Sequence, residues 1–270
     1  MIKHFKRYIK RLTRLIKRNE MQILPGQIAF FLVLSLIPII SLVGFIASSF
    51  QIDIHVISDG LNNTLPNEII GIILPALNSP SVLTGISLLF GFFIASNGTD
   101  SIIIASNVLY RINEETYLKR RIKAMIMFLI LIMLFLFMLI VFAFGDSILK
   151  FLLNLIFDEI PTFIVFITLI LKWTFGLFGA FFMIKMIFTT APNSPIPSKY
   201  MNKGAIFTTL AWIFTTLIYS EYVKNIANYN LFYGSLSNIV ILMFWIYILS
   251  YTLVIGIAIN SDNYLTSKED

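Results

Sequence analysis

Long apolar runs separated by short polar segments dominate the pattern along this chain. Six runs have roughly 20 apolar residues or more, the length an α-helix needs to cross the hydrocarbon core of a bilayer. They lie at about residues 28–50, 83–108, 122–145, 162–190, 204–223 and 236–260. The pattern predicts an all-α polytopic membrane protein with six transmembrane helices. Pro192, Pro195 and Pro197 are expected to end the fourth span, because proline cannot continue a helix.

Composition agrees with a lipid-solvated exterior. The 270 residues are 58% hydrophobic and 13% charged, with a mean hydropathy of +0.87, whereas soluble domains carry about 25% charged residues. A soluble chain this apolar could not cover its surface with polar groups. No small-residue cleavage site follows the first run, so we expect that run to remain as a transmembrane helix.

The basic residues predict an orientation. Sixteen of the 20 Lys and Arg lie before the first run, between the second and third, between the fourth and fifth, or after the sixth, and the opposite loops hold only Lys150 and Lys224. Basic loops stay on the cytoplasmic side, which predicts a bacterial cytoplasmic membrane protein with both termini in the cytoplasm. We expect a basic segment at 1–20, the membrane domain at 21–262 and a cytoplasmic tail at 263–270.

The basic amino-terminal segment is itself amphipathic. Phe5, Ile9, Leu12 and Ile16 recur at helical spacing among Lys and Arg, which places an apolar stripe beside a cationic face. Such a helix lies on anionic lipid, and each basic residue near the surface adds about 1 kcal/mol. The run could also serve only to set topology. A nucleic-acid partner is not expected, because stacking aromatics and a partner fold are missing.

The first outer loop, residues 51–80, is too long for a simple turn. Its apolar residues form clusters shorter than a spanning length. They predict one or two short helices at the outer interface, with a packed external cap as the alternative.

A polar stretch interrupts the second apolar run, where residues 94–111 read IASNGTDSIIIASNVLYR. On one helix, Ser96, Asp100 and Asn107 share a face, and Asn97 and Ser101 flank it. Asp100 lies roughly 15 Å from the cytoplasmic end of the run, near mid-membrane. A carboxylate there should face the bundle interior or water.

Partners for this stretch are sought in other spans. Lys172 and Lys185 in the fourth run could each pair with Asp100, and Tyr247 and Tyr251 in the sixth run lie one helical turn apart. Two interpretations stay open, namely a polar cavity that handles a polar or charged group, and a packed hydrogen-bond or ion-pair cluster that fixes helix packing.

Several motifs, taken in order, resemble the YihY/BrkB family of bacterial inner-membrane proteins, once labelled ribonuclease BN and also named UPF0761. These are a Ser-x-x-Pro in the first run, Asn-x-x-Tyr at the end of the second, a proline-containing loop before Gly-Ala, and Tyr-Gly-Ser before the last run. The resemblance covers nearly the whole chain and implies a six-helix membrane protein of unsettled function. The matching positions include Ser35, Pro38, Asn107, Tyr110, Pro192, Gly204, Ala205, Trp212, Tyr233, Gly234, Gly256 and Asn260.

The residues offer little material for catalysis. There are no cysteines, and the two histidines, His4 and His55, are far apart, so no metal and no cofactor are expected. Metal-dependent phosphodiester hydrolysis needs clustered carboxylates or histidines, and Glu114 and Glu115 would point in different directions on a helix. We therefore expect a protein that is not an enzyme.

Two functions follow from these patterns. The first is transport or accommodation of a lipid, an envelope precursor or another amphipathic substrate. The alternative is a structural or partner-binding scaffold for envelope machinery. The expected partners are membrane lipids, with anionic lipid at the amino-terminal helix, and either an envelope protein or further copies of this chain.

The orientation is tested by fusing reporter tags to the two ends. Both tags should report from the cytoplasmic face, because an even number of spans returns the chain to its starting side. Protease or fluorescence accessibility in intact cells and inverted vesicles measures this. Tags on opposite faces would contradict the six-span topology.

Overall fold

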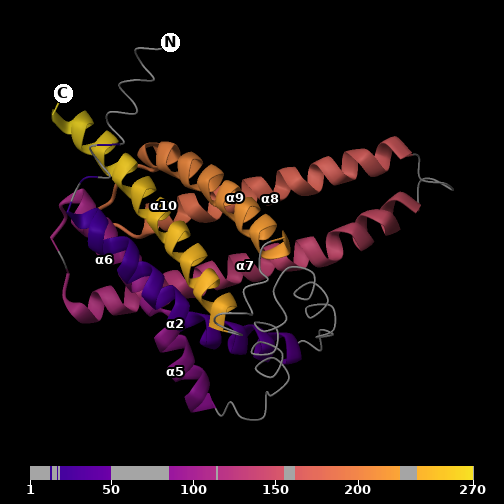
Figure 1. Ribbon diagram of the computed structural model, residues 1–270, viewed down its shortest axis with the longest axis horizontal. Helices are drawn as coiled ribbons and strands as arrows, with labels where there is room; N and C mark the ends of the chain where they lie inside the picture. Colours follow the sequence, from indigo (N-terminus) through magenta and orange to yellow (C-terminus); the bar gives the residue numbers. More distant parts are fainter. Residues whose placement is uncertain are drawn as a thin grey trace.

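A computed structural model of the chain describes residues 13, 17, 19–49, 85–113, 115–154, 162–225 and 236–269. Its elements within these ranges are all helical (Figure 1). They are α2 (Glu20–Ser49), α5 (Gly85–Ala95), α6 (Asn97–Tyr110), α7 (Tyr117–Asn154), α8 (Thr162–Thr190), the 3₁₀ helix η2 (Ser198–Met201), α9 (Asn202–Asn225) and α10 (Leu236–Glu269). The predicted all-α class is confirmed.

Three of the described helices contain a stretch long and apolar enough to cross a membrane. These stretches are Tyr117–Met138, Phe166–Thr190 and Val240–Lys268, and α2 contains a shorter apolar stretch at Glu20–Leu36. A polytopic membrane protein follows from them. The count of six spans stays a prediction, because several of the apolar runs extend into residues outside the described ranges.

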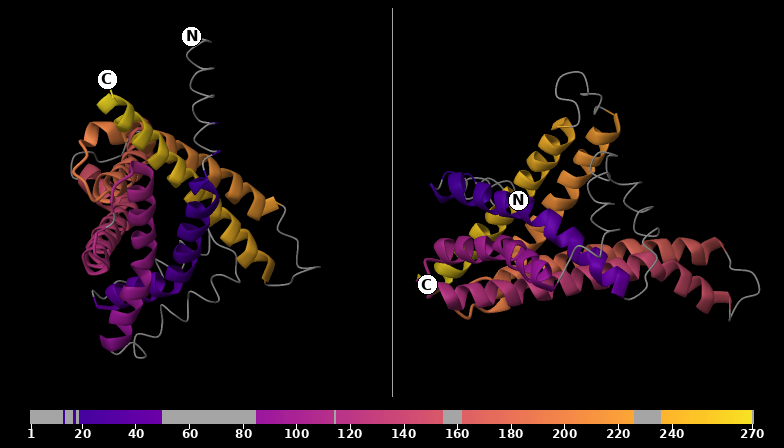
Figure 2. Two further views of the ribbon diagram at one scale, coloured as in Figure 1. Left: turned by 90° about the vertical axis from the view of Figure 1, so that its left-hand side faces the viewer. Right: turned by 90° about the horizontal axis from the view of Figure 1, so that it is seen from below.

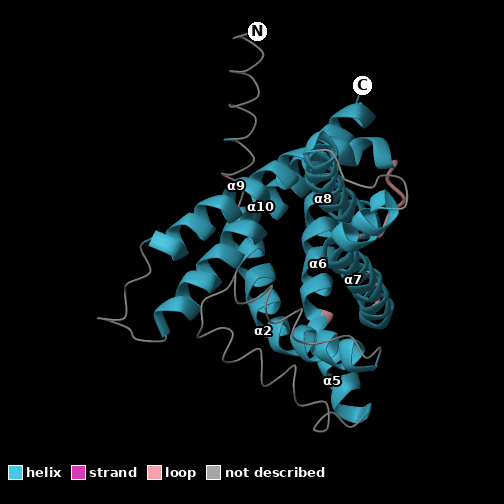
Figure 3. Ribbon diagram, turned by 90° about the vertical axis from the view of Figure 1, so that its right-hand side faces the viewer, coloured by secondary structure: helices cyan, strands magenta, loops and turns pink. Residues whose placement is uncertain are grey.

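The helices converge at one end of the molecule and diverge at the other. The pair α7 and α8 and the pair α9 and α10 meet at one end and point away in different directions (Figures 1 and 2). In Figure 3, α7 and α8 are seen nearly end-on, whereas α9 and α10 run across the view. We call the convergent end the basic end, because the helix ends that meet there carry or adjoin these cations: Arg111 after α6, Lys119, Arg120, Arg121 and Lys123 at the start of α7, Lys199 in η2, Lys203 at the start of α9, and Lys268 at the end of α10.

The buried core lies at the basic end. One cluster of buried side chains joins α2, α6, α7, α8, α9 and α10, and it includes Ile28, Ile103, Ile184 and Leu253. Away from this core, large apolar side chains are exposed along α8, α9 and α10, among them Trp173, Phe178, Phe214, Leu217 and Phe244. Exposed apolar surface of this extent suits contact with lipid.

Helices α9 and α10 approach closely at two glycines. A Cβ atom on Gly204 would lie 2.2 Å from the carbonyl oxygen of Gly256 and 2.5 Å from Nδ2 of Asn260. The backbone N–H of Gly204 donates to Oδ1 of Asn260 over 2.7 Å, and Nε1 of Trp212 donates to the carbonyl of Leu249 over 3.0 Å. Small residues allow such helix contacts inside a membrane.

The helix boundaries differ from the predicted spans in three places. The second apolar run is not one helix, since α5 ends at Ala95 and α6 begins at Asn97. Helix α2 begins at Glu20, ahead of the predicted span at 28–50, and α10 continues to Glu269, beyond the predicted span at 236–260. The membrane boundaries within these helices stay predictions. The proline segment does end the fourth run, because α8 stops at Thr190.

Other predictions fall outside the described residues. The amphipathic helix in residues 1–20, except for Thr13, Lys17, Asn19 and Glu20, is one of them, and the interfacial helices in 51–80 are another. The motif positions Tyr233 and Gly234 also lie outside the described ranges.

The contact between α9 and α10 predicts a stability difference between two glycine substitutions. Gly204→Ala should destabilise the protein by about 1–3 kcal/mol, because its Cβ would overlap backbone and amide atoms. Gly26→Ala is the control, since nothing lies within 4 Å of its added Cβ, and alanine favours the helix by about 1 kcal/mol. Thermal unfolding in detergent measures both. Equal melting temperatures for the two variants would contradict the close approach.

Candidate functional site

The polar stretch begins where the second run is divided. At the junction of α5 and α6, the carbonyl of Phe93 accepts a hydrogen bond from Oγ of Ser96 over 2.8 Å. The same carbonyl also accepts from Nη2 of Arg121 on α7. A serine hydroxyl that bonds back to the preceding turn competes with the helical ladder, which accounts for a break at this position.

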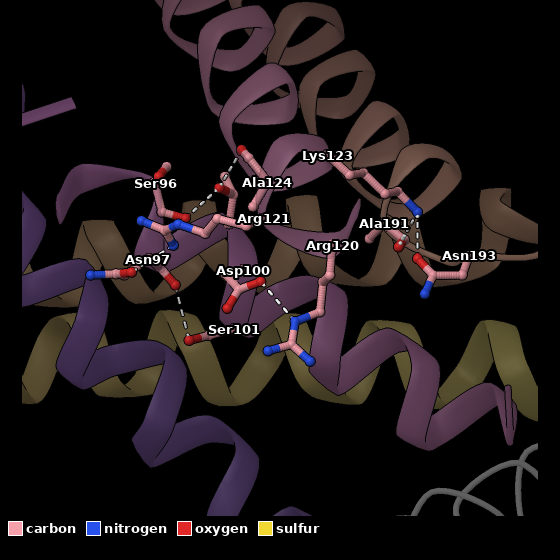
Figure 4. Close-up of polar contacts among 11 residues, drawn as sticks. Ser96, Asn97, Asp100, Ser101, Arg120, Arg121, Lys123, Ala124, Ala191 and Asn193 are labelled. Atoms are coloured by element: carbon pink, nitrogen blue, oxygen red, sulfur yellow. Dashed lines mark hydrogen bonds and ion pairs between the residues drawn. The ribbon is translucent and has the colours of Figure 1, made fainter. Parts of the chain in front are cut away.

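Arg121 joins this junction to α7 (Figure 4). Its side chain is buried, Nη1 donates to Oδ1 of Asn97 over 2.6 Å, and the guanidinium carbon lies 3.8 Å from the centroid of the Phe93 ring. A planar guanidinium can donate to two oxygens while it stacks on an aromatic face. The cation is thus held by an amide, a carbonyl and a ring.

Two hydroxyls complete this packed cluster. Oγ1 of Thr99 donates to the carbonyl of Ala124 on α7 over 2.8 Å and shares its proton with the carbonyl of Ser96, also at 2.8 Å. Oγ of Ser101 donates to the carbonyl of Asn97 over 3.0 Å. Thr99 thus binds α6 to α7, whereas Ser101 bonds within α6. Together with Arg121 they form a packed interhelical cluster.

Asp100 forms its ion pair with Arg120, and both side chains are largely buried. Oδ1 of Asp100 lies 3.0 Å from Nε of Arg120, and the two side chains are 15% and 13% exposed. The sequence had pointed to Lys172 or Lys185 of the fourth run. Helix α7 begins at Tyr117, so Arg120 is not in a loop but on the first turn, beside α6.

The ion pair places Asp100 beside the cations at the start of α7. The first two turns of α7 carry Lys119, Arg120, Arg121 and Lys123, and such a density of cations belongs at the membrane boundary rather than in hydrocarbon. Asp100 lies beside these residues (Figure 4), which favours a shallower position than the sequence predicts, and its depth in the membrane stays a prediction.

The remaining candidates of the intramembrane set lie elsewhere. Lys172 and Lys185 are half-buried on α8, and the rings of Tyr247 and Tyr251 on α10 have centroids 6.1 Å apart. None of these four takes part in the contacts just described. Their assignment to a common polar site stays a prediction.

A second polar cluster fixes the connection between α8 and η2. Nζ of Lys123 donates to the carbonyls of Ala191 and Pro192 over 2.9 and 2.7 Å, and to Oδ1 of Asn193 over 2.9 Å. Oδ1 of Asn107 accepts from the backbone N–H of Asn193 over 3.0 Å. A lysine on the last carbonyls of a helix satisfies groups that have no helical partner.

This cluster places two motif residues in one site, since Asn107 and Pro192 both contact it. Other motif residues have local roles. Ser35 is buried on α2 and donates to the carbonyl of Leu32 over 2.8 Å, and Pro38 lies within the same helix.

A hollow of about 530 Å³ opens beside the second cluster at the basic end. It lies between the connection from α6 to α7, the connection from α8 to η2, and the last turns of α10. Its lining combines cations, amides, phenols and one carboxylate: Tyr110, Arg111, Ile112, Asn113, Glu115, Asn193, Ser194, Tyr264, Leu265 and Lys268. Binding pockets for small molecules have volumes of about 300–1,000 Å³.

Tyr110, a motif residue, forms an inner wall of this hollow. Its side chain is buried, its hydroxyl donates to Sδ of Met201 over 3.3 Å, and its ring centroid lies 6.1 Å from that of Tyr264. Burial, and then the neighbouring Tyr264, raise the pKa of Tyr110. The phenol is therefore neutral at physiological pH.

The sequence pattern does not point to several of the site residues. It marks Arg120, Arg121 and Lys123 only as cations that set the topology, although their place at the start of an apolar run puts them on a helix. The hollow was missed because it joins three segments distant in sequence. Within the described ranges, no three His, Cys, Asp or Glu side chains lie together as metal ligands.

The sequence has recognisable relatives. The sequence model of the Virulence factor BrkB family matches residues 12–269. YfkH of Bacillus subtilis (strain 168), whose name describes it as ribonuclease-like, is 24% identical over 262 residues, 94% of each chain. A UPF0761 membrane protein of Vibrio atlanticus (strain LGP32) is 23% identical over 261 residues, 93% of this chain and 80% of the relative. No solved structure matches significantly.

The ion pair predicts a specific energetic coupling. A double-mutant cycle of Asp100→Ala with Arg120→Ala should give a coupling of about 1 kcal/mol, because each single change leaves the partner without its bond. The matched cycle with Lys185→Ala should give none. Unfolding in mixed detergent micelles measures both. A larger coupling to Lys185 would restore the pairing that the sequence suggested.

Proposed function

This chain belongs to the Virulence factor BrkB family, as its motifs predicted, and we propose that it is a non-enzymatic membrane protein that accommodates the polar head of an amphipathic molecule at its basic end. A lipid or an envelope precursor fits this description. The apolar outer surface keeps the protein in the membrane, and the basic end offers polar groups next to it.

The observation that carries this proposal is the hollow of about 530 Å³ at the basic end. Its lining is amphipathic, because Ile112 and Leu265 stand beside amide, hydroxyl and charged groups. A few polar groups in a partly apolar pocket are the usual means of orienting a ligand. Tyr110 reaches the hollow directly, and Asn107 supports it through Asn193, so two motif positions contribute to it.

The packed clusters support a binding site at the basic end rather than in mid-membrane. The side chains of Ser96, Thr99, Asp100 and Arg121 are occupied by protein partners. They hold α6 and α7 together and so fix two walls of the hollow. By the positive-inside rule this end faces the cytoplasm, and a polar head would enter from that side.

The hollow favours binding over hydrolysis. Among the described residues that line it, Glu115 is the one carboxylate, whereas metal-assisted hydrolysis uses several clustered carboxylates or histidines. The ribonuclease-like description in the name of YfkH is therefore not extended to this chain.

A scaffold for envelope machinery is the second candidate, and one observation favours it. Asp100 and Arg121 lie in a closely packed cluster, as expected of a protein whose polar residues serve helix packing. In this role an envelope protein or another copy of the chain would be the partner, and the hollow would hold no ligand.

Single cysteines in the cysteine-free chain distinguish these functions. Cysteine at 113, in the hollow, should react quickly with a polar maleimide in detergent, and bacterial lipid should slow the reaction. Cysteines at 96 and 107, where the native side chains are fully buried, should react slowly. Lys119→Cys is the control, because it is exposed but outside the hollow, and lipid should leave its rate unchanged.

Each candidate function predicts a different set of labelling rates. Equal rates at 113 with and without lipid would favour the scaffold. Fast labelling at 96 and 107 would contradict the packed cluster and restore a wet cavity in the second run.

A further inference from the structure

We infer that the hollow at the basic end binds a phosphate group, with Arg111 and Lys268 as its cationic ligands. The inference rests on the proposed function, because it names the chemical class of the polar head. The phosphate can belong to a lipid headgroup or to a soluble phosphate ester, since both present the same oxygens to the protein.

The hollow offers donors from three directions. Arg111 and Asn113 come from the connection between α6 and α7, Ser194 from the connection between α8 and η2, and Lys268 from the end of α10. A tetrahedral phosphate has oxygens on several sides, whereas a carboxylate presents two oxygens in one plane. Cations and neutral donors on separate walls therefore match phosphate better than carboxylate.

Arg111 is held in a backbone conformation that side chains other than glycine rarely adopt. Its φ angle is 56°, in the left-handed region. Its N–H donates to the carbonyl of Val108 over 3.2 Å, and the next N–H, of Ile112, donates to the carbonyl of Asn107 over 2.9 Å. Glycine is the usual residue at such a helix end. An arginine at this position, exposed at the mouth of the hollow, indicates that its side chain has a use that offsets the strain.

Lys268 and the aromatic wall complete the cationic side. Nζ of Lys268 lies 4.9 Å from the centroid of the Tyr264 ring, which keeps the ammonium beside the hollow. Tyr110 is neutral, so no phenolate opposes an anion there. Among the described lining residues, Arg111 and Lys268 carry two positive charges and Glu115 carries one negative charge.

Substitution of Glu115 should change the phosphate affinity in the opposite direction to substitution of the two cations. Its carboxylate repels any anion in the hollow, so its neutralisation should strengthen phosphate binding while neutralisation of either cation weakens it. A loss of binding through general unfolding would not produce changes of opposite sign.

The test measures phosphate binding to the full chain, purified in a phosphate-free maltoside detergent. The probes are inorganic phosphate, glycerol 3-phosphate, a short-chain phosphatidic acid, and an alkyl carboxylate of similar length, each followed by calorimetry. We expect Arg111→Gln and Lys268→Gln each to raise the Kd for the phosphate probes about tenfold, the effect of one charge-assisted bond. Glu115→Gln should lower it about threefold.

Lys203→Gln is the matched control. It removes the same charge at the same end of the molecule, but Lys203 bonds to Asn263 over 3.1 Å and does not line the hollow. Its Kd should equal that of the unmodified chain. Arg111→Gly is a second variant, because it should relieve backbone strain and raise Tm while it still loses phosphate affinity.

The outcomes separate the sources of phosphate and the two proposals. Tighter binding of phosphatidic acid than of glycerol 3-phosphate supports a lipid headgroup, and equal binding supports a soluble ester. Equal affinity for the alkyl carboxylate, or phosphate binding that Arg111→Gln and Lys268→Gln leave unchanged, overturns the phosphate inference. Lipid protection of a cysteine at 113 without phosphate dependence would overturn it while the proposed function stands.

Discussion

The buried guanidinium of Arg121 constrains the basic end of this molecule, because its charge needs partners from the protein instead of from water. The guanidinium of Arg121 is surrounded by the ring of Phe93, the amide of Asn97 and a main-chain carbonyl. In surroundings of low polarity each of these bonds is expensive to lose. The cation therefore fixes the break between α5 and α6 against the first turns of α7. The neighbouring ion pair of Asp100 with Arg120 and the contacts of Lys123 depend on that arrangement, because they use the same turns.

Because these contacts hold the helices together, the polar groups that line the hollow are also held in place. Asn193 is oriented by Asn107 and Lys123, and Tyr110 by Met201 and Tyr264. Side chains restrained in this way lose little conformational freedom when a ligand binds. The packed clusters and the hollow are thus parts of one arrangement, in which buried polar bonds position the exposed ones.

Part of this arrangement could be predicted from the sequence. The length of the apolar runs predicts membrane helices, the prolines predict the end of α8, and the ordered motifs predict the family. The partner of Asp100 could not be predicted, because the rule that assigns basic residues to loops conceals that Arg120 lies on a helix facing α6. The hollow could not be predicted either, since Tyr110, Asn193 and Lys268 are brought together only by the packing of α6, α8 and α10. Helical periodicity reports which face a residue occupies, but not which helix it meets.

The divergence of the helix pairs has a mechanical consequence. Helix α7 has 38 residues and at 1.5 Å per residue is about 57 Å long, and the polar contacts described above lie near its first turns. If α7 stays straight, it turns as a rigid rod about its end at the basic end of the molecule. A rotation of α7 by about 5° around its first turns displaces its last residues by about 5 Å, given that length. If a molecule binds in the hollow as proposed, a small rotation of the helix ends there would displace the far tips of the same helices by several times as much as the ends themselves.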